Sequence, residues 1–109
     1  MDMKLILAIV ANEDASKVMS NLIKERFFVT KLATTGGFLM AGNTTLLIGT
    51  DVESVNKAIE VIGTYSKTRK KLVPNSIPNE FGMFASYPIE VKVGGATIFV
   101  IDVERFEKL

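Results

Sequence analysis

The first stretch of the chain with a clear hydrophobic pattern is Lys4–Val10, which is almost continuously apolar. A run of this length without polar alternation is typical of a strand that is covered on both faces. The segment Asn12–Arg26 then changes to helical spacing, with apolar residues at i, i+3, i+4, i+7 and i+8. The spacing predicts a helix with one apolar stripe, made by Ala15, Val18, Met19, Leu22 and Ile23.

Two further strand candidates, Phe27–Ala33 and Thr44–Gly49, flank a glycine-rich bend. Thr50–Glu53 has the spacing of a capping box, which predicts a second helix with Thr50 as its N-cap. We expect this helix to end near Gly63–Ser66. Its inward positions are Val52, Val55, Ala58, Ile59 and Ile62.

The last third of the chain begins with residues 67–86, which contain two prolines and are expected to form a long irregular loop. Tyr87–Val93 alternates between apolar and charged residues, as a half-buried strand does. Gly94–Gly95 is a strong signal for a two-residue hairpin turn, so Ala96–Asp102 is predicted to return beside the preceding strand. Residues 103–109 are expected to add a short helical turn.

The element order is therefore β-α-β-β-α-β, with the last strand extended into a C-terminal hairpin. Two helices on one face of a mainly antiparallel sheet define the ferredoxin-like arrangement, an α+β fold. The chain has 109 residues, the size of one domain, and no internal repeat or domain boundary is evident. The sequence predicts a single domain over residues 1–109.

Composition narrows the function mainly by exclusion. A net charge of +1 gives no electrostatic reason to expect binding to nucleic acid polymers or membranes. The longest apolar run, Leu5–Ala11, is too short to span a bilayer, and Met1–Lys4 shows no signal-peptide cleavage pattern, so a cytoplasmic protein is expected. The chain has no cysteine and no histidine, which removes thiol and imidazole catalysis and the usual zinc ligands. We expect neither an enzyme nor a cofactor.

The most informative segment is the bend within residues 30–49, TKLATTGGFLMAGNTTLLIG. Glycines at 36, 37 and 42 let a ligand approach the main chain closely, and the neighbouring threonines and Asn43 supply uncharged donors and acceptors. Phe38 offers a flat apolar face. Together these features suit a nucleobase, although the glycines taken alone favour a simple tight turn.

The same residues resemble the PII-like cyclic di-AMP receptor family. The likeness rests on Thr30–Leu39, on Ala41–Thr45 and on Val93–Thr97, and it extends along almost the whole chain, most weakly across 66–86. The resemblance implies a PII-like homotrimer that binds cyclic di-AMP in clefts between neighbouring subunits. It also implies a non-enzymatic role in signal transduction, with a long loop relaying the signal to an unidentified downstream protein.

The resemblance also assigns roles to individual residues. Thr30 and Asn43 are expected to hydrogen-bond one adenine, and Gly49 to offer backbone contacts. Gly37, Phe38 and Leu39 are expected to form a wall against the ligand. Lys108, near the C-terminus, is expected to reach the ligand from the adjoining subunit. Each of these residues has an ordinary structural role as its alternative: Thr30 and Asn43 can satisfy backbone groups, and Leu39 can pack in the trimer.

Two positions depart from the family pattern, since Phe28 and Met40 stand where arginines are usual. Phe28 can instead stack on a base. These departures favour one alternative, a ligand-free trimer with a structural or protein-binding role. A second alternative is a divalent-metal-binding trimer similar to the CutA-like proteins; the missing histidine and cysteine argue against it, although carboxylates can hold such a metal. The basic cluster Lys67, Arg69, Lys70 and Lys71 is either a solvated helix end or a docking site for phosphate or a partner.

Overall fold

The computed structural model describes residues 2–32, 42–78 and 84–109, and the side chains of residues 73–87 lie outside that description. A short 3-10 turn, Val52–Ser54, leads into the second helix. The helices and strands, in chain order, are β1 Met3–Ala11, α1 Asn12–Lys24, β2 Phe28–Lys31, β3 Asn43–Asp51, α2 Val55–Tyr65, β4 Arg69–Pro78, β5 Phe84–Val93 and β6 Ala96–Val103.

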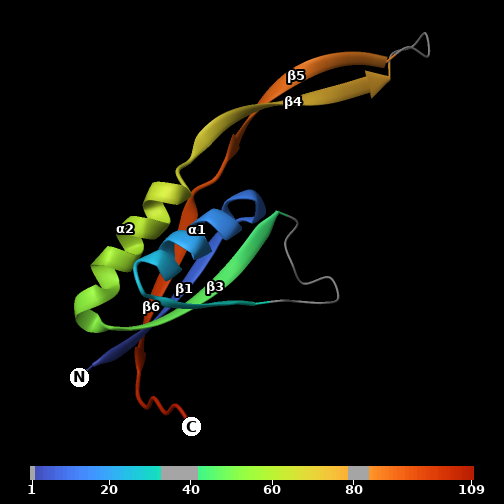
Figure 1. The fold of residues 1–109 in the computed structure, drawn as a ribbon. Coiled ribbons are helices and arrows are strands. Elements are labelled where there is room, and N and C mark those ends of the chain that lie inside the picture. The colour runs from blue at the N-terminus through green and yellow to red at the C-terminus, as the bar shows by residue number, and fades with distance from the viewer. Residues whose placement is uncertain (1, 33–41, 79–83) are drawn as a thin grey trace.

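Four of the strands form one antiparallel sheet in the order β2-β3-β1-β6, and both helices cover the same face of it (Figure 1). With β6 as the fourth strand, this is the strand order of a ferredoxin-like sheet. The predicted α+β class is confirmed. The two remaining strands, β4 and β5, form a separate two-stranded ribbon that projects from the sheet domain (Figure 1).

The hydrophobic core lies between the sheet and the two helices. Alternate residues of the two central strands point into it and are fully buried, as the period of two in a strand requires. Strand β1 is therefore covered by helices on one face only, in contrast to the expectation from its continuous apolar run. The buried side chains are Ile6, Ala8 and Val10 of β1, Leu46 and Ile48 of β3, Val18 and Leu22 of α1, and Ala58 and Ile62 of α2.

Helix α1 ends two residues earlier than predicted, at Lys24. Arg26 adopts a left-handed conformation with φ of 70°, and the amide of Phe27 donates to the carbonyl oxygen of Leu22 at 2.9 Å. This six-to-one hydrogen bond is that of a Schellman motif, which usually has glycine where this chain has Arg26. Phe27 is buried beside the core and supplies the accompanying hydrophobic contact.

The predicted capping box at Thr50 is wrong by one residue. Strand β3 continues through Asp51, whose carboxylate accepts a hydrogen bond from the amide of Ser54 at 3.0 Å. Asp51 is thus the N-cap of the 3-10 turn, whereas Thr50 is buried in the strand. Aspartate is as good an N-cap as serine or threonine, which explains why Asp51 can take the place predicted for Thr50.

The expectation of an irregular loop over 67–86 is also wrong, because Arg69–Pro78 form β4. Strand β5 begins at Phe84, earlier than predicted, and pairs with β4 along its length, with Pro74 opposite Pro88. A two-stranded ribbon has two free edges, so proline can be tolerated where a residue's N–H points to solvent.

The turn predicted at Gly94–Gly95 is a junction between two sheets instead of a hairpin. Both glycines have positive φ, 87° and 83°, and the amide of Gly95 donates to the carbonyl oxygen of Ser66. A Cβ atom on Gly94 would collide with the carbonyl oxygen of Lys67. Glycine is needed here because the chain passes close to the end of α2 as it leaves the ribbon for β6.

The C-terminal residues 104–109 do not form the predicted helical turn but an extended tail. Within the described ranges 2–32, 42–78 and 84–109, no helix has the length and apolar character needed to cross a membrane.

Candidate functional site

The face of the sheet opposite the helices, which we call the open face, is largely apolar. Residues paired across strands share a face, and because Val29 packs against the core, Phe28 and Thr30 on β2 point to the open face. Among the described residues, only the C-terminal tail crosses this face. Its apolar members are Met3, Leu5, Leu7 and Ile9 of β1, Leu47 of β3, Phe99 and Ile101 of β6, and Phe28 of β2.

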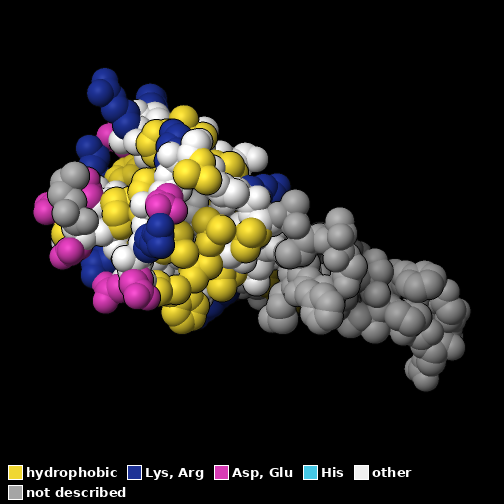
Figure 2. All heavy atoms as spheres, turned by 90° about the horizontal axis from the view of Figure 1, so that it is seen from below, with side chains coloured by type: hydrophobic (Ala, Val, Ile, Leu, Met, Phe, Trp, Pro, Cys, Tyr) yellow, Lys and Arg dark blue, Asp and Glu magenta, His cyan; other side chains and the backbone are white. Residues whose placement is uncertain are grey.

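Several of these side chains are unusually exposed for their size. Phe28 is 79% exposed, Phe99 54% and Ile101 46%. Figure 2, which views the molecule from the end where both termini lie, shows hydrophobic side chains gathered between acidic and basic groups. A contiguous apolar surface of this kind is typical of a protein interface or a ligand site.

At one end of the open face, Gly49 leaves a gap in the apolar surface. Gly49 pairs with Phe28 on one side and with Leu5 on the other, and no atom lies within 4 Å of the place its Cβ would occupy. The result is an open space above the backbone of β3, bounded by an aromatic ring and an aliphatic side chain. A flat apolar group fits between such neighbours, and the sheet backbone lies directly beneath it.

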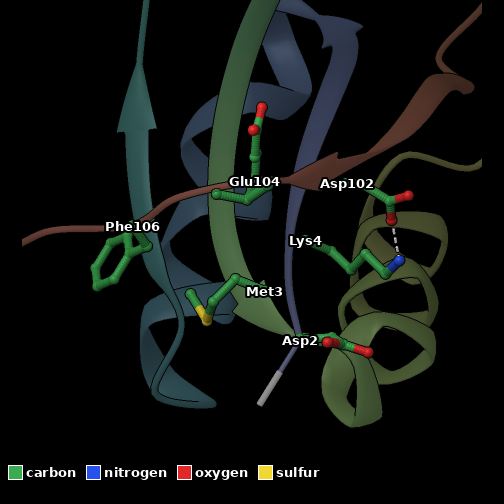
Figure 3. Close-up of a pocket in the computed structure, with 7 residues that line it drawn as sticks. Asp2, Met3, Lys4, Asp102, Glu104 and Phe106 are labelled. Carbon is green, nitrogen blue, oxygen red and sulfur yellow. Dashed lines mark hydrogen bonds and ion pairs between the residues drawn. The ribbon is translucent and has the colours of Figure 1, made fainter.

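The C-terminal tail closes this end of the site. It leaves β6, crosses β1 and β3 and carries Phe106 towards β2 (Figure 3). A hollow of about 700 Å³ lies beneath the tail, lined by residues that include Met3, Asp102 and Glu104. Further along, the ammonium of Lys108 lies 5.4 Å from the centre of the Phe28 ring, within the range of a cation–π contact. Lys108 thus reaches Phe28 of its own chain, and its contact with a ligand of the adjoining subunit stays a prediction.

Thr30 belongs to the same end of the site, but Asn43 does not. Thr30 is exposed, lies opposite Leu47 and is one position along the open face from Phe28. Asn43 is the first residue of β3 and lies six residues before Gly49, a distance of about 20 Å along the strand. From Asn43 to Leu47, the residue opposite Thr30, the distance along the strand is about 13 Å. Within one chain Thr30 and Asn43 are therefore well separated, and their shared contact with one adenine stays a prediction.

The three residues predicted to wall the ligand, Gly37, Phe38 and Leu39, lie outside the described residues, as does Met40.

A polar cluster that was not expected from the sequence lies beside Asn43. The amide of Asn12, the first residue of α1, donates to the carbonyl oxygen of Gly42 at 2.7 Å. The hydroxyl of Thr44, which is buried, donates to the side-chain oxygen of Asn12 at 2.5 Å. These bonds fix the start of β3 to the start of α1. The pairing of Ala11 with Asn43 could have revealed the cluster, but only once the strand register was known.

Four charged residues line the hollow beneath the tail: Asp2, Lys4, Asp102 and Glu104. Lys4 forms an ion pair with Asp102 beside the hollow, drawn as a dashed line in Figure 3. The hydrogen bond to Asp102 raises the pKa of Lys4, which keeps its ammonium charged. In the part of the chain that the structure describes, no three histidine, cysteine, aspartate or glutamate side chains come together as a metal-binding group. Beside the Phe28 ring itself, the described charged group is the ammonium of Lys108.

Comparison with known families shows that residues 3–109 match the family described as cyclic-di-AMP receptor. The match covers essentially the whole chain, so the chain belongs to the cyclic-di-AMP receptor family. This is a family of signalling receptors and not of enzymes.

Among solved structures, the chain is similar to a functionally unknown protein from Pediococcus pentosaceus ATCC 25745. The two are 41% identical, and the superposition has a TM-score of 0.76. It covers 100% of this chain and 99% of that one.

Proposed function

We propose that this protein is a cytoplasmic receptor that binds cyclic di-AMP as a homotrimer and carries out no reaction of its own. The observation that carries the proposal is the match of residues 3–109 to the cyclic-di-AMP receptor family. On this proposal the protein needs no cofactor. Binding is relayed through the β4–β5 ribbon to a downstream protein.

The apolar open face supports the trimer. Leu7 lies at its centre, between Leu47 of β3 and Phe99 of β6, in a row of apolar side chains that runs across three strands. Burial of such a surface against other subunits removes apolar area from water, which stabilises an assembly by about 25 cal/mol for each Å² buried. A second and third copy are the occupants that the proposal assigns to this face.

The gap above Gly49 is the place we assign to one adenine. A base lying there has the Phe28 ring at its edge or face, the backbone of β3 below it and the hydroxyl of Thr30 within reach along β2. Aromatic stacking and uncharged hydrogen bonds suit a neutral base. The phosphodiesters of the ligand carry negative charge, and Lys108 is the described cation that lies beside this space.

Asn43 is assigned to the same cleft from a different subunit. Within one chain it is about 13 Å from the Leu47 position beside Thr30. In a closed threefold ring each cleft is lined by two subunits through different surfaces. The proposal therefore places Thr30 of one subunit and Asn43 of its neighbour on the same ligand.

A thermal-shift panel tests the proposed function. Cyclic di-AMP at about one hundred times its dissociation constant is expected to raise the melting temperature by roughly 10 °C. Cyclic di-GMP and ATP at equal concentration serve as the comparison and are expected to give smaller shifts. An unchanged melting temperature with all three nucleotides would favour a ligand-free structural trimer. If a divalent metal ion, added in a separate sample, is the only addition that raises the melting temperature, the metal-binding alternative is favoured.

Restoring the family arginine at position 28 is expected to tighten binding. Phe28→Arg places a guanidinium beside the ligand, and a hydrogen bond to a charged group is worth enough to lower the dissociation constant about tenfold. Calorimetry with cyclic di-AMP measures the change, and Phe28→Leu is the control, because it removes the ring without adding charge. Equal or weaker binding by Phe28→Arg would show that the aromatic ring already fills the arginine's role.

A further inference from the structure

The ribbon is attached to the sheet domain by an ion-pair cluster at its base. The guanidinium of Arg69, at the start of β4, donates to both carboxylate oxygens of Asp14, at 2.8 Å and 3.1 Å. It also lies 3.7 Å from the carboxylate of Glu13, which pairs with the ammonium of Lys71 at 3.3 Å. Asp14 is buried, and its hydrogen bonds raise the pKa of Arg69. We call these four residues the ribbon anchor.

The ribbon depends on this anchor because it consists of only two strands. An isolated two-stranded ribbon is marginally stable in water. Leu72, just beyond the anchor on β4, is 66% exposed, and the ribbon stretches the molecule to a longest dimension of 67 Å. Its other described attachment is the backbone junction at Gly95 and Ser66. The orientation of the ribbon is therefore set by a few contacts at its base.

The acidic half of the anchor lies next to the polar cluster at the start of β3. Glu13 and Asp14 directly follow Asn12, whose backbone and side chain are hydrogen-bonded to Gly42 and Thr44. A continuous chain of short contacts thus runs from the start of β3, through the first turn of α1, to the base of the ribbon. Asn43 lies between Gly42 and Thr44, the two residues to which Asn12 is hydrogen-bonded.

We infer that the first turn of α1 couples the ligand site to the ribbon. A shift at the start of β3 moves Asn12 through its hydrogen bonds to Gly42 and Thr44. The neighbouring Glu13 and Asp14 then move with it and displace Lys71 and Arg69 through their ion pairs. In this respect the inference rests on the proposed function, because it takes Asn43 as a ligand contact. The physical link itself belongs to the free protein and can be tested without ligand. Arg69 acts as a positioning residue for the ribbon.

Hydrogen exchange of the whole protein tests the link, read at the amides of residues 70–72 and 89–93 near the base of the ribbon. In the free protein, Arg69→Ala is expected to speed exchange there about tenfold, since a paired, buried carboxylate loses its partner. Arg69→Lys keeps the positive charge and is expected to recover part of the protection. Lys57→Ala breaks the Lys57–Glu25 pair at 3.0 Å on the helices, away from the ribbon, and is the matched control.

The coupling also requires the hydrogen bond from the hydroxyl of Thr44 to the side chain of Asn12. Thr44→Val removes this hydrogen bond with little change in side-chain shape. Thr44→Val is expected to speed exchange at the base of the ribbon by about threefold in the free protein. With saturating cyclic di-AMP, exchange at these amides is expected to change in the wild type. Arg69→Ala and Thr44→Val are expected to lose that change while calorimetry still detects binding.

The outcomes separate the two proposals. If the amides at the base of the ribbon exchange at the wild-type rate in Arg69→Ala, the ion pairs of the ribbon anchor do not hold the ribbon. An unaltered ribbon in free Thr44→Val, or a ligand response that persists in both variants, would overturn the coupling. Absence of calorimetric heat in the wild type would contradict the proposed function, and the free-protein measurements would still decide the link.

Discussion

Leu7→Asp is expected to turn the proposed trimer into a folded monomer that does not bind cyclic di-AMP. Leu7 lies on β1 at the centre of the open face, where the proposal buries it against neighbouring subunits. A carboxylate buried there without a partner costs about 3 kcal/mol or more in each subunit, and a trimer carries that cost in all three. The monomer keeps its fold, because the core lies on the other face of the sheet.

Sedimentation or light scattering measures the mass, and calorimetry measures the binding. Ser20→Asp is the matched control: it introduces the same charge on an exposed position of α1, away from the open face. We expect Ser20→Asp to remain trimeric and to bind normally. A trimeric Leu7→Asp variant would show that the open face is not the subunit interface.

Loss of both Thr30 and Asn43 is expected to have a comparable effect on binding, by a different route. Each side chain contributes an uncharged hydrogen bond in the proposed site, so Thr30→Ala and Asn43→Ala are each expected to weaken binding about tenfold. The double variant is expected to lose about one hundredfold if the two contacts are independent. Thr64→Ala and Asn21→Ala change the same residue types on the exposed helices and are expected to have no effect.

Mixed trimers test whether the two residues come from different subunits. When Thr30→Ala and Asn43→Ala subunits are coexpressed, a cleft with Thr30 from one and Asn43 from the other is intact. Random mixing is expected to restore wild-type affinity to about a quarter of the clefts. Binding that stays weak in every mixed trimer would mean that both contacts come from one chain.

The sheet and the helices could be predicted from the sequence because their patterns record burial directly. The prediction for Lys4–Val10 differs from β1 by one residue at each end. Ala15, Val18 and Leu22 of the predicted helical stripe are buried and Met19 is partly buried, whereas Ile23, near the end of α1, is 56% exposed and was wrongly placed on the buried face. In these elements one physical effect, removal of apolar side chains from water, dominates the choice of structure.

The ribbon could not be predicted because its pairing depends on tertiary contacts. The glycines at 94 and 95 signal positive φ, but that signal does not say which strands pair. The contacts of these glycines with Lys67 and with the buried Ser66 direct the chain away from a hairpin. Strand β5 therefore pairs with β4, and β6 pairs with β1. Strand β4 was not predicted because Pro74 argues against a central strand. Proline does not argue against a strand of a two-stranded ribbon.

The candidate site was predictable in its residue types but not in its geometry. Thr30, Gly49 and Phe28 were singled out from the sequence, and the structure brings them together at one end of the open face. The separation of Asn43 from them follows from the strand register, which residue spacing alone does not reveal. The contact between Lys108 and Phe28 links positions 80 residues apart and depends on the path of the tail.

A crystal structure of the protein with cyclic di-AMP decides whether the proposed site is correct. We expect a trimer with an adenine above the backbone of Gly49, beside Phe28, within hydrogen-bond distance of Thr30 of one subunit and Asn43 of its neighbour. A trimer whose gap above Gly49 stays empty at saturating ligand, with the nucleotide bound elsewhere or absent, would contradict it.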